Sequence, residues 1–139
     1  MPIDNWTRIS QKALRFALTI SPDVIVVHVD SSEEPSGLAD DWPRLVEEPA
    51  RSAGMPVPKL KVVESPYRFV IGPLLEFILG VERANPRRQI AVILPNLVES
   101  HWYHRFLHNQ RAELLTALLL IRAEQRIVII NVPWYFVEK

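Results

Sequence analysis

Three short apolar runs rich in valine and isoleucine constrain the fold of this chain more than any other feature. They are Val24–Asp30, Gln89–Leu94 and Arg126–Pro133. Their apolar residues occupy consecutive positions, as in strands that are buried on both faces of a parallel sheet. The segments between them carry apolar residues every three or four positions, which is helical spacing. The chain is therefore expected to alternate strands with helices.

Two weaker strands and four helices complete the alternation. Met1–Asp4 has the pattern of the last fragment of a strand, and Leu60–Glu64 that of a short strand at a sheet edge. Helices are expected over four segments: Arg8–Thr19 with Thr7 or Asn5 as its cap, about Leu38–Glu48 with Pro49 at its end, Ser65 to Asn85, and from about Leu97 onward.

The last of these helices is predicted from Asn96 and Glu99, which have the spacing of a capping box. A change of apolar face further along predicts a bend near residues 108–110. With right-handed crossovers, the elements predict an α/β fold: a three-layer, parallel, doubly wound sheet in a single domain, 1–139. The first strand of such a sheet is usually central, yet it is truncated here. Either Met1 lies within a longer chain, or a partner's segment completes the sheet.

Composition narrows the possible functions. The 139 residues suit one domain, and the formal net charge of +0 gives no general attraction to nucleic acid or to acidic membranes. The chain has no cysteine, which excludes disulfides, thiolate nucleophiles and cysteine-ligated zinc. It opens without a signal peptide, and its apolar windows are shorter than the roughly 20 residues that span a bilayer. We expect a soluble domain.

Polar side chains gather where ligands bind in open α/β sheets, at the carboxyl ends of the strands. Asp4 and Asn5 follow the first strand, His28 and Asp30 end the second, and Asn96 follows a later one. Each of these side chains could instead have a purely structural role. Asp4 and Asn5 suit helix capping, and a histidine inside an apolar strand suits the core. The two explanations stay open at this point.

A second set of candidates shares one helix face. His101, His104, His108 and Arg111 are spaced three, four and three residues apart. They could face an anion or another subunit, or be solvated or packed; a metal site is not expected, because no acidic third ligand is near. Asn109 and Gln110 suit a base edge or a helix break. Trp102, Tyr103 and Phe106 suit base stacking, the core or a dimer contact.

No pattern of catalytic residues is present. Ser10, Ser21, Ser65 and Ser100 lack the sequence context of an activated nucleophile, and no acid–base pair is evident. We therefore expect a domain that is not an enzyme.

The order of elements and the opening PIDNWTRISQKALRFALTI…VIVVHVD resemble the universal stress protein fold, which is Rossmann-like. The later part resembles a more specific group, on SPYRFVIGPLLEFI, IAVILPNLVESHWYHRFLHNQRAELLTALLL and VIINVPWYF. These segments are similar to the C-terminal domain that follows the membrane helices in bacterial permeases for amino acids or potassium. Those permeases belong to the amino acid–polyamine–organocation superfamily. The resemblance covers nearly the whole chain.

The resemblance implies a cytoplasmic regulatory or assembly domain, a homodimer at the inner face of the plasma membrane that contacts the permease's membrane domain. In some potassium importers this domain binds cyclic di-AMP, which inhibits transport. The resemblance places Asp4 and Asn5 where the stress protein fold contacts adenine or ribose. Together with His28, Asp30, Asn96, His108, Asn109 and Arg111, they are the residues that we expect to bind an adenine nucleotide, cyclic di-AMP or ATP. No nucleic acid polymer is implied.

ATP fits less well than a dinucleotide. Universal stress proteins that bind ATP carry a glycine-rich phosphate loop where this chain reads PNLVESHWYHRF, without glycine. Backbone with side chains at every position cannot approach phosphates as a glycine loop does. The alternative function is a stand-alone universal stress protein that binds ATP or another nucleotide. A reading frame extending upstream through apolar segments would exclude that alternative.

Overall fold

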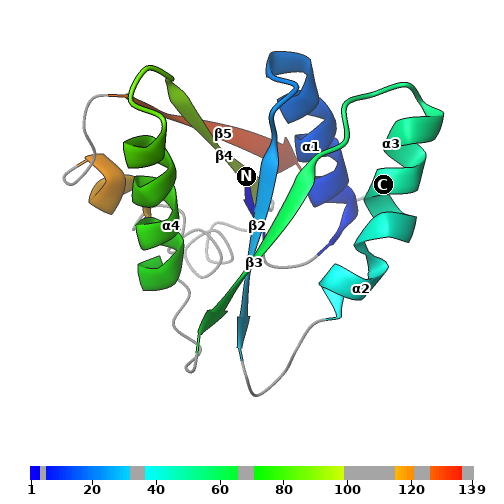
Figure 1. Cartoon of the computed structure of the whole chain (residues 1–139), viewed down its shortest axis with the longest axis horizontal. Helices are drawn as coiled ribbons and strands as arrows, with labels where there is room; N and C mark the ends of the chain where they lie inside the picture. The colour runs from blue at the N-terminus through cyan, green and yellow to red at the C-terminus, as the bar shows by residue number, and fades with distance from the viewer. Residues whose placement is uncertain (4–5, 32–36, 66–70, 99–114, 121–125, 136–139) are drawn as a thin grey trace.

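The computed structural model describes residues 1–3, 6–31, 37–65, 71–98, 115–120 and 126–135 (Figure 1). In chain order the elements are β1 (Pro2–Ile3), α1 (Arg8–Ile20), β2 (Ile25–Ser31), α2 (Leu38–Trp42), the π-helical turn η1 (Pro43–Glu47), α3 (Glu48–Ser52), β3 (Lys59–Ser65), α4 (Ile71–Ala84), β4 (Ile90–Val98) and β5 (Ile127–Tyr135). Residues 115–120 are also helical. The expected α/β alternation is confirmed.

All paired strands run parallel, in two small sheets. One has the order β1-β2-β3, and the other pairs β4 with β5. The expected edge position of the third strand is confirmed, because β3 ends its sheet. β1 also contacts β4, so the two sheets lie side by side. This arrangement is compatible with a Rossmann-like fold.

Helices cover both faces of the strands. On one face, α1 and α2 pack against Val26 of β2 and Ile93 of β4. On the other face, α4 and residues 115–120 pack against Val27 of β2 and Val92 of β4. Adjacent residues of a strand point to opposite faces, so both sheets contribute to both cores. The strands thus form one layer between two helical layers (Figure 1).

The alternation of backbone groups explains why β1 does not join β4 in a ladder. The Met1 nitrogen donates to the Ile25 carbonyl (2.8 Å), and the Met1 carbonyl accepts from Val27 N–H (2.9 Å). Because the backbone groups of Met1 face β2, those of the next residue, Pro2, face β4. Proline has no N–H group, so β1 offers β4 no donor at this position.

The same alternation shows how β4 continues through Pro95. Ile90 donates its N–H to the Arg126 carbonyl (2.8 Å), on the side of the β5 ladder. Every second residue of β4 therefore faces β5, and Pro95 faces β1 instead. By the same count Pro133 faces away from β4. Neither proline removes a hydrogen bond of the β4–β5 ladder, which is where proline is tolerated in strands.

Two sequence predictions about this region are wrong, because neither proline interrupts the β4–β5 ladder. Asn96 does not cap a helix that begins near Leu97, because β4 runs to Val98 and Asn96 pairs with Pro133. Likewise the closing strand does not end at Pro133 but includes Trp134 and Tyr135. The predicted bend near residues 108–110 lies outside the described residues.

Pro49 does not end the helical segment after Gly37, which continues to Ser52. Its predecessor η1 is a π-helical turn, in which the N–H of Glu48 donates to the Pro43 carbonyl five residues earlier. The wider turn places Pro49 in the first turn of α3. There the missing N–H group falls at the junction with the π-helical turn, where the regular α-helical hydrogen-bond pattern is already interrupted.

The start of α1 carries the predicted cap at Thr7. The Thr7 hydroxyl accepts from the Ser10 N–H (3.3 Å), and the Ser10 hydroxyl accepts from the Thr7 N–H (3.4 Å). Replacing Thr7 by alanine is expected to lower the free energy of unfolding by about 1 kcal/mol. Urea denaturation measures the loss. Thr7→Ser keeps the hydroxyl and should differ little from the parent; an equal loss in both variants would contradict the capping role.

Candidate functional site

The predicted site lies at the carboxyl ends of the parallel strands, and the structure describes part of it. His28 and Asp30 belong to the last half of β2, and Asn96 lies near the end of β4. Because the strands are parallel, these positions share one edge of the strand layer. The other predicted site residues lie outside the described residues: Asp4, Asn5, His108, Asn109 and Arg111.

His28 is buried, with 6% of its surface exposed. Its Nδ1 lies 3.3 Å from the carbonyl oxygen of Ile3 in β1. A carbonyl can only accept, so this contact requires the proton on Nδ1 and leaves Nε2 of a neutral ring as an acceptor. Nε2 is buried and has no hydrogen-bond partner among the described residues, because Oδ1 of Asp30 lies 3.6 Å away, which is too far. Nε2 is thus enclosed by protein, with the Asp30 carboxylate beside it.

Asp30 places a carboxylate beside this acceptor. Its side chain is 20% exposed, and in the β2–β3 register Asp30 lies opposite Glu64. Carboxylates accept hydrogen bonds from hydroxyl and amino groups, but they repel phosphate. This edge therefore favours hydrogen-bond donors over anions. His28 and Asp30 lie together near the end of β2, and their predicted role in ligand binding stays a prediction.

Asn96 has its backbone fixed by the β4–β5 pairing rather than by a helix cap. The predicted role of its side chain in ligand binding stays a prediction. Among the described residues, no group of three His, Cys, Asp or Glu side chains is arranged to hold a metal ion. No helix within the described part of the chain is long and apolar enough to cross a membrane.

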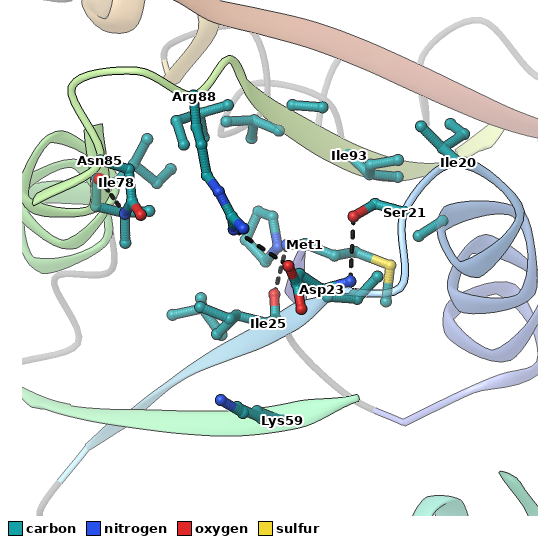
Figure 2. A pocket seen from close by; sticks show the side chains of 18 of the residues that line it. Met1, Ile20, Ser21, Asp23, Ile25, Lys59, Ile78, Asn85, Arg88 and Ile93 are labelled. Carbon is teal, nitrogen blue, oxygen red and sulfur yellow. Dashed lines mark hydrogen bonds and ion pairs between the residues drawn. The ribbon is translucent and has the colours of Figure 1, made fainter. Parts of the chain in front are cut away.

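A second site, which sequence reasoning missed, is a cleft of about 870 Å³ at the opposite edge, at the amino ends of the strands (Figure 2). β2 and β4 form its sides. Ala17 and Ile20 of α1 line one wall, and Phe77 and Ile78 of α4 line the other. Met1 lies inside it (Figure 2). Sequence reasoning had no local signal for this cleft, because its lining residues come from several separate elements.

Charged groups mark the mouth of this cleft. Arg88, before β4, reaches across to Asp23, before β2, with an N–O distance of 3.1 Å (Figure 2). Both side chains are about two-thirds exposed, at 65% and 68%. The Met1 amino group lies deeper, and burial lowers its pKa from 8.0 to about 5. The interior of the cleft thus disfavours charge.

Comparison with known proteins gives one family and one curated relative. The model of the family described as "KimA potassium transporter C-terminal domain" matches residues 1–134. The potassium transporter KimA of Bacillus subtilis (strain 168) is 27% identical over 139 residues, which is 98% of this chain and 21% of the relative. The chain thus spans about a fifth of the length of that relative.

Proposed function

This chain belongs to the family of KimA potassium transporter C-terminal domains, and from that premise we propose that it is the cytoplasmic regulatory and dimerisation domain of a potassium transporter. The family match over residues 1–134 is the observation that carries the proposal. Of the two kinds of permease that the sequence resembles, the family's description favours the potassium transporter over the amino-acid permease. The domain would contact the transporter's membrane domain and would not be an enzyme.

The regulatory ligand in this proposal is an adenine nucleotide such as cyclic di-AMP, bound at the carboxyl ends of the strands. Adenine carries an exocyclic amino group, which is a hydrogen-bond donor. The carboxylate of Asp30, whose side chain is 20% exposed, suits such a donor. This chemistry supports a base at the β2 edge, with the phosphates directed away from Asp30 and Glu64.

The alternative of a stand-alone universal stress protein finds less support. The matching family consists of transporter domains, and the curated relative is about five times longer than this chain. The position of the expected phosphate loop has no glycine. ATP binding of the kind seen in universal stress proteins is therefore the weaker proposal.

Isothermal titration with cyclic di-AMP and with ATP tests the ligand. Cyclic di-AMP is expected to bind more tightly, and Asp30→Ala to weaken it by about tenfold or more, since a lost hydrogen bond to a charged group is worth about 1.5–3 kcal/mol. Arg44→Ala, which changes an exposed side chain of η1, is the matched control. The absence of heat with either nucleotide at high protein concentration would contradict the sensing function and leave the assembly function alone.

A further inference from the structure

The outer side of α1 carries positive charge without negative charge. The 13 residues of this helix include Arg8, Lys12 and Arg15, but no aspartate or glutamate. All three cations are exposed, on the side of the helix opposite its buried residues. Because the formal net charge of the whole chain is +0, this side of α1 is a local concentration of positive charge.

The stability of α1 does not account for this pattern. Arg8 is the first residue of the helix, where the helix dipole favours anions and disfavours cations. Lys12 follows Arg8 by four residues and precedes Arg15 by three, so like charges are neighbours along the helix, which costs stability. The pattern therefore suits an anionic partner outside the helix.

The next helical segment shows the more usual arrangement of charge. α2, η1 and α3 mix acidic and basic side chains, and Arg44 pairs with Asp41 while Arg51 pairs with Glu47. Both arginines are exposed, as the cations of α1 are. Exposure to water alone therefore does not explain why α1 has cations only.

Exposed apolar side chains lie beside these cations. Phe16 is 41% exposed and Ile20, one turn later, is 50% exposed. At about 100° per residue, these two residues and the three cations fall within about 140° of the helix circumference. Val128 of β5, 40% exposed, faces the same side of the strand layer, because Ile130 and Val132 pack against the α1 cluster.

The combination of cations and apolar side chains matches the surface of an anionic bilayer. Lysine and arginine are attracted to anionic lipid headgroups, and exposed aromatic and aliphatic side chains enter the boundary between headgroups and acyl chains. A soluble anion would match the cations alone. The α1 surface is defined by five residues: Arg8, Lys12, Arg15, Phe16 and Ile20.

We propose that the α1 surface docks on anionic lipid headgroups at the inner face of the membrane. This inference rests on the proposed function, in which the domain is joined to a membrane domain. The covalent connection raises the effective concentration of lipid at the domain, so a weak contact is sufficient. Because α1 lies alongside the strands, docking by its outer side leaves the carboxyl ends of the strands accessible to a soluble nucleotide.

Sedimentation with lipid vesicles tests this contact. The 139-residue chain is expected to bind vesicles of phosphatidylglycerol and phosphatidylcholine, and not vesicles of phosphatidylcholine alone. Raising the salt concentration from about 0.05 M to about 0.5 M should weaken binding by at least about tenfold, because salt screens the charges. Equal binding to both kinds of vesicle, or no binding to the anionic vesicles at low salt, would overturn the proposal.

A matched pair of double variants assigns the contact to α1. Arg8→Gln with Arg15→Gln is expected to weaken vesicle binding by about twentyfold, since each cation near an anionic surface is worth about fivefold. Arg44→Gln with Arg51→Gln removes the same charge from the neighbouring segment and should weaken binding by less than about threefold. Melting curves establish that both variants fold. Equal binding by the two double variants would overturn the proposal.

A second copy of the chain is the other possible occupant of this surface. Phe16→Gln should weaken vesicle binding without changing the molecular mass in solution, which sedimentation equilibrium measures. A dimer that dissociates in this variant while vesicle binding is unchanged would overturn the proposal in favour of an interface between two copies.

Labelling tests the contact in the whole transporter. These 139 residues contain no cysteine, so Thr19→Cys, on the exposed side of α1, can carry a fluorophore once cysteines elsewhere are replaced. In nanodiscs, brominated anionic lipid is expected to quench this label and to leave a label at Arg51→Cys unchanged. Equal quenching at both positions would overturn the proposal. The measurement contains no nucleotide and the titration with cyclic di-AMP contains no lipid, so the two failures are distinguishable.

Discussion

Replacing Trp42 by alanine is expected to lower the free energy of unfolding by about 3–5 kcal/mol, because the change leaves a cavity in a core. Trp42 is 2% exposed and packs in the cluster that joins α1, α2 and β4. Its ring meets Trp6 edge to face, with centroids 5.6 Å apart and planes at 76°. Its Nε1 donates to the buried Pro58 carbonyl at 3.4 Å. The substitution removes all three interactions.

Thermal and urea denaturation of the 139-residue chain measure this loss. A fall in melting temperature of roughly 10–20 °C is expected, at about 4 °C per kcal/mol for a domain of this size. Trp42→Phe keeps a ring in the cluster but loses the donor, so it should cost about 1–2 kcal/mol. Arg44→Ala, on the exposed side of the same segment, should change stability by less than about 0.5 kcal/mol. Similar losses in all three variants would contradict the packing role of Trp42.

The elements that the sequence predicted best are those with a strong period or a strong apolar run. α1 and β2 lie within a residue or two of their expected ends, because Thr7 caps one and consecutive valines fill the other. The strand ends near Pro95 and Pro133 were wrong for a specific reason. A proline ends a strand only when its missing N–H faces the partner strand, and that orientation depends on register. Register is set when the two strands pair, so it cannot be predicted from the sequence of either strand alone.

The two candidate sites also differ in how far the sequence could predict them. The place of His28 and Asp30 could be predicted because an apolar strand ends there, and position along the chain already implies position at the sheet edge. The cleft could not, because its walls come from residues as distant in sequence as Ile20, Ile78 and Ile93. Only the fold brings these three residues to one cleft.

The buried amino group of Met1 predicts a dependence of stability on pH. Its pKa is about 5 in the folded chain and 8.0 when exposed. Between these values the unfolded chain binds a proton that the folded chain does not, so stability rises with pH. The pKa values differ by about 3, and each unit corresponds to about 1.4 kcal/mol. The free energy of unfolding should therefore fall by up to about 4 kcal/mol between pH 8 and pH 5.

Acetylation of the amino terminus isolates this contribution from those of other titrating groups. The acetylated chain has an amide N–H that still donates to Ile25 but cannot be protonated, as in a continuing strand. It should match the free chain above pH 8 and exceed its stability increasingly down to about pH 5, where the difference becomes constant. Urea denaturation at pH 5, 6, 7 and 8 measures both curves, and intact mass confirms that Met1 is retained. Parallel curves would mean that the amino group remains solvated in the folded chain, and Met1 would then not lie within the strand layer.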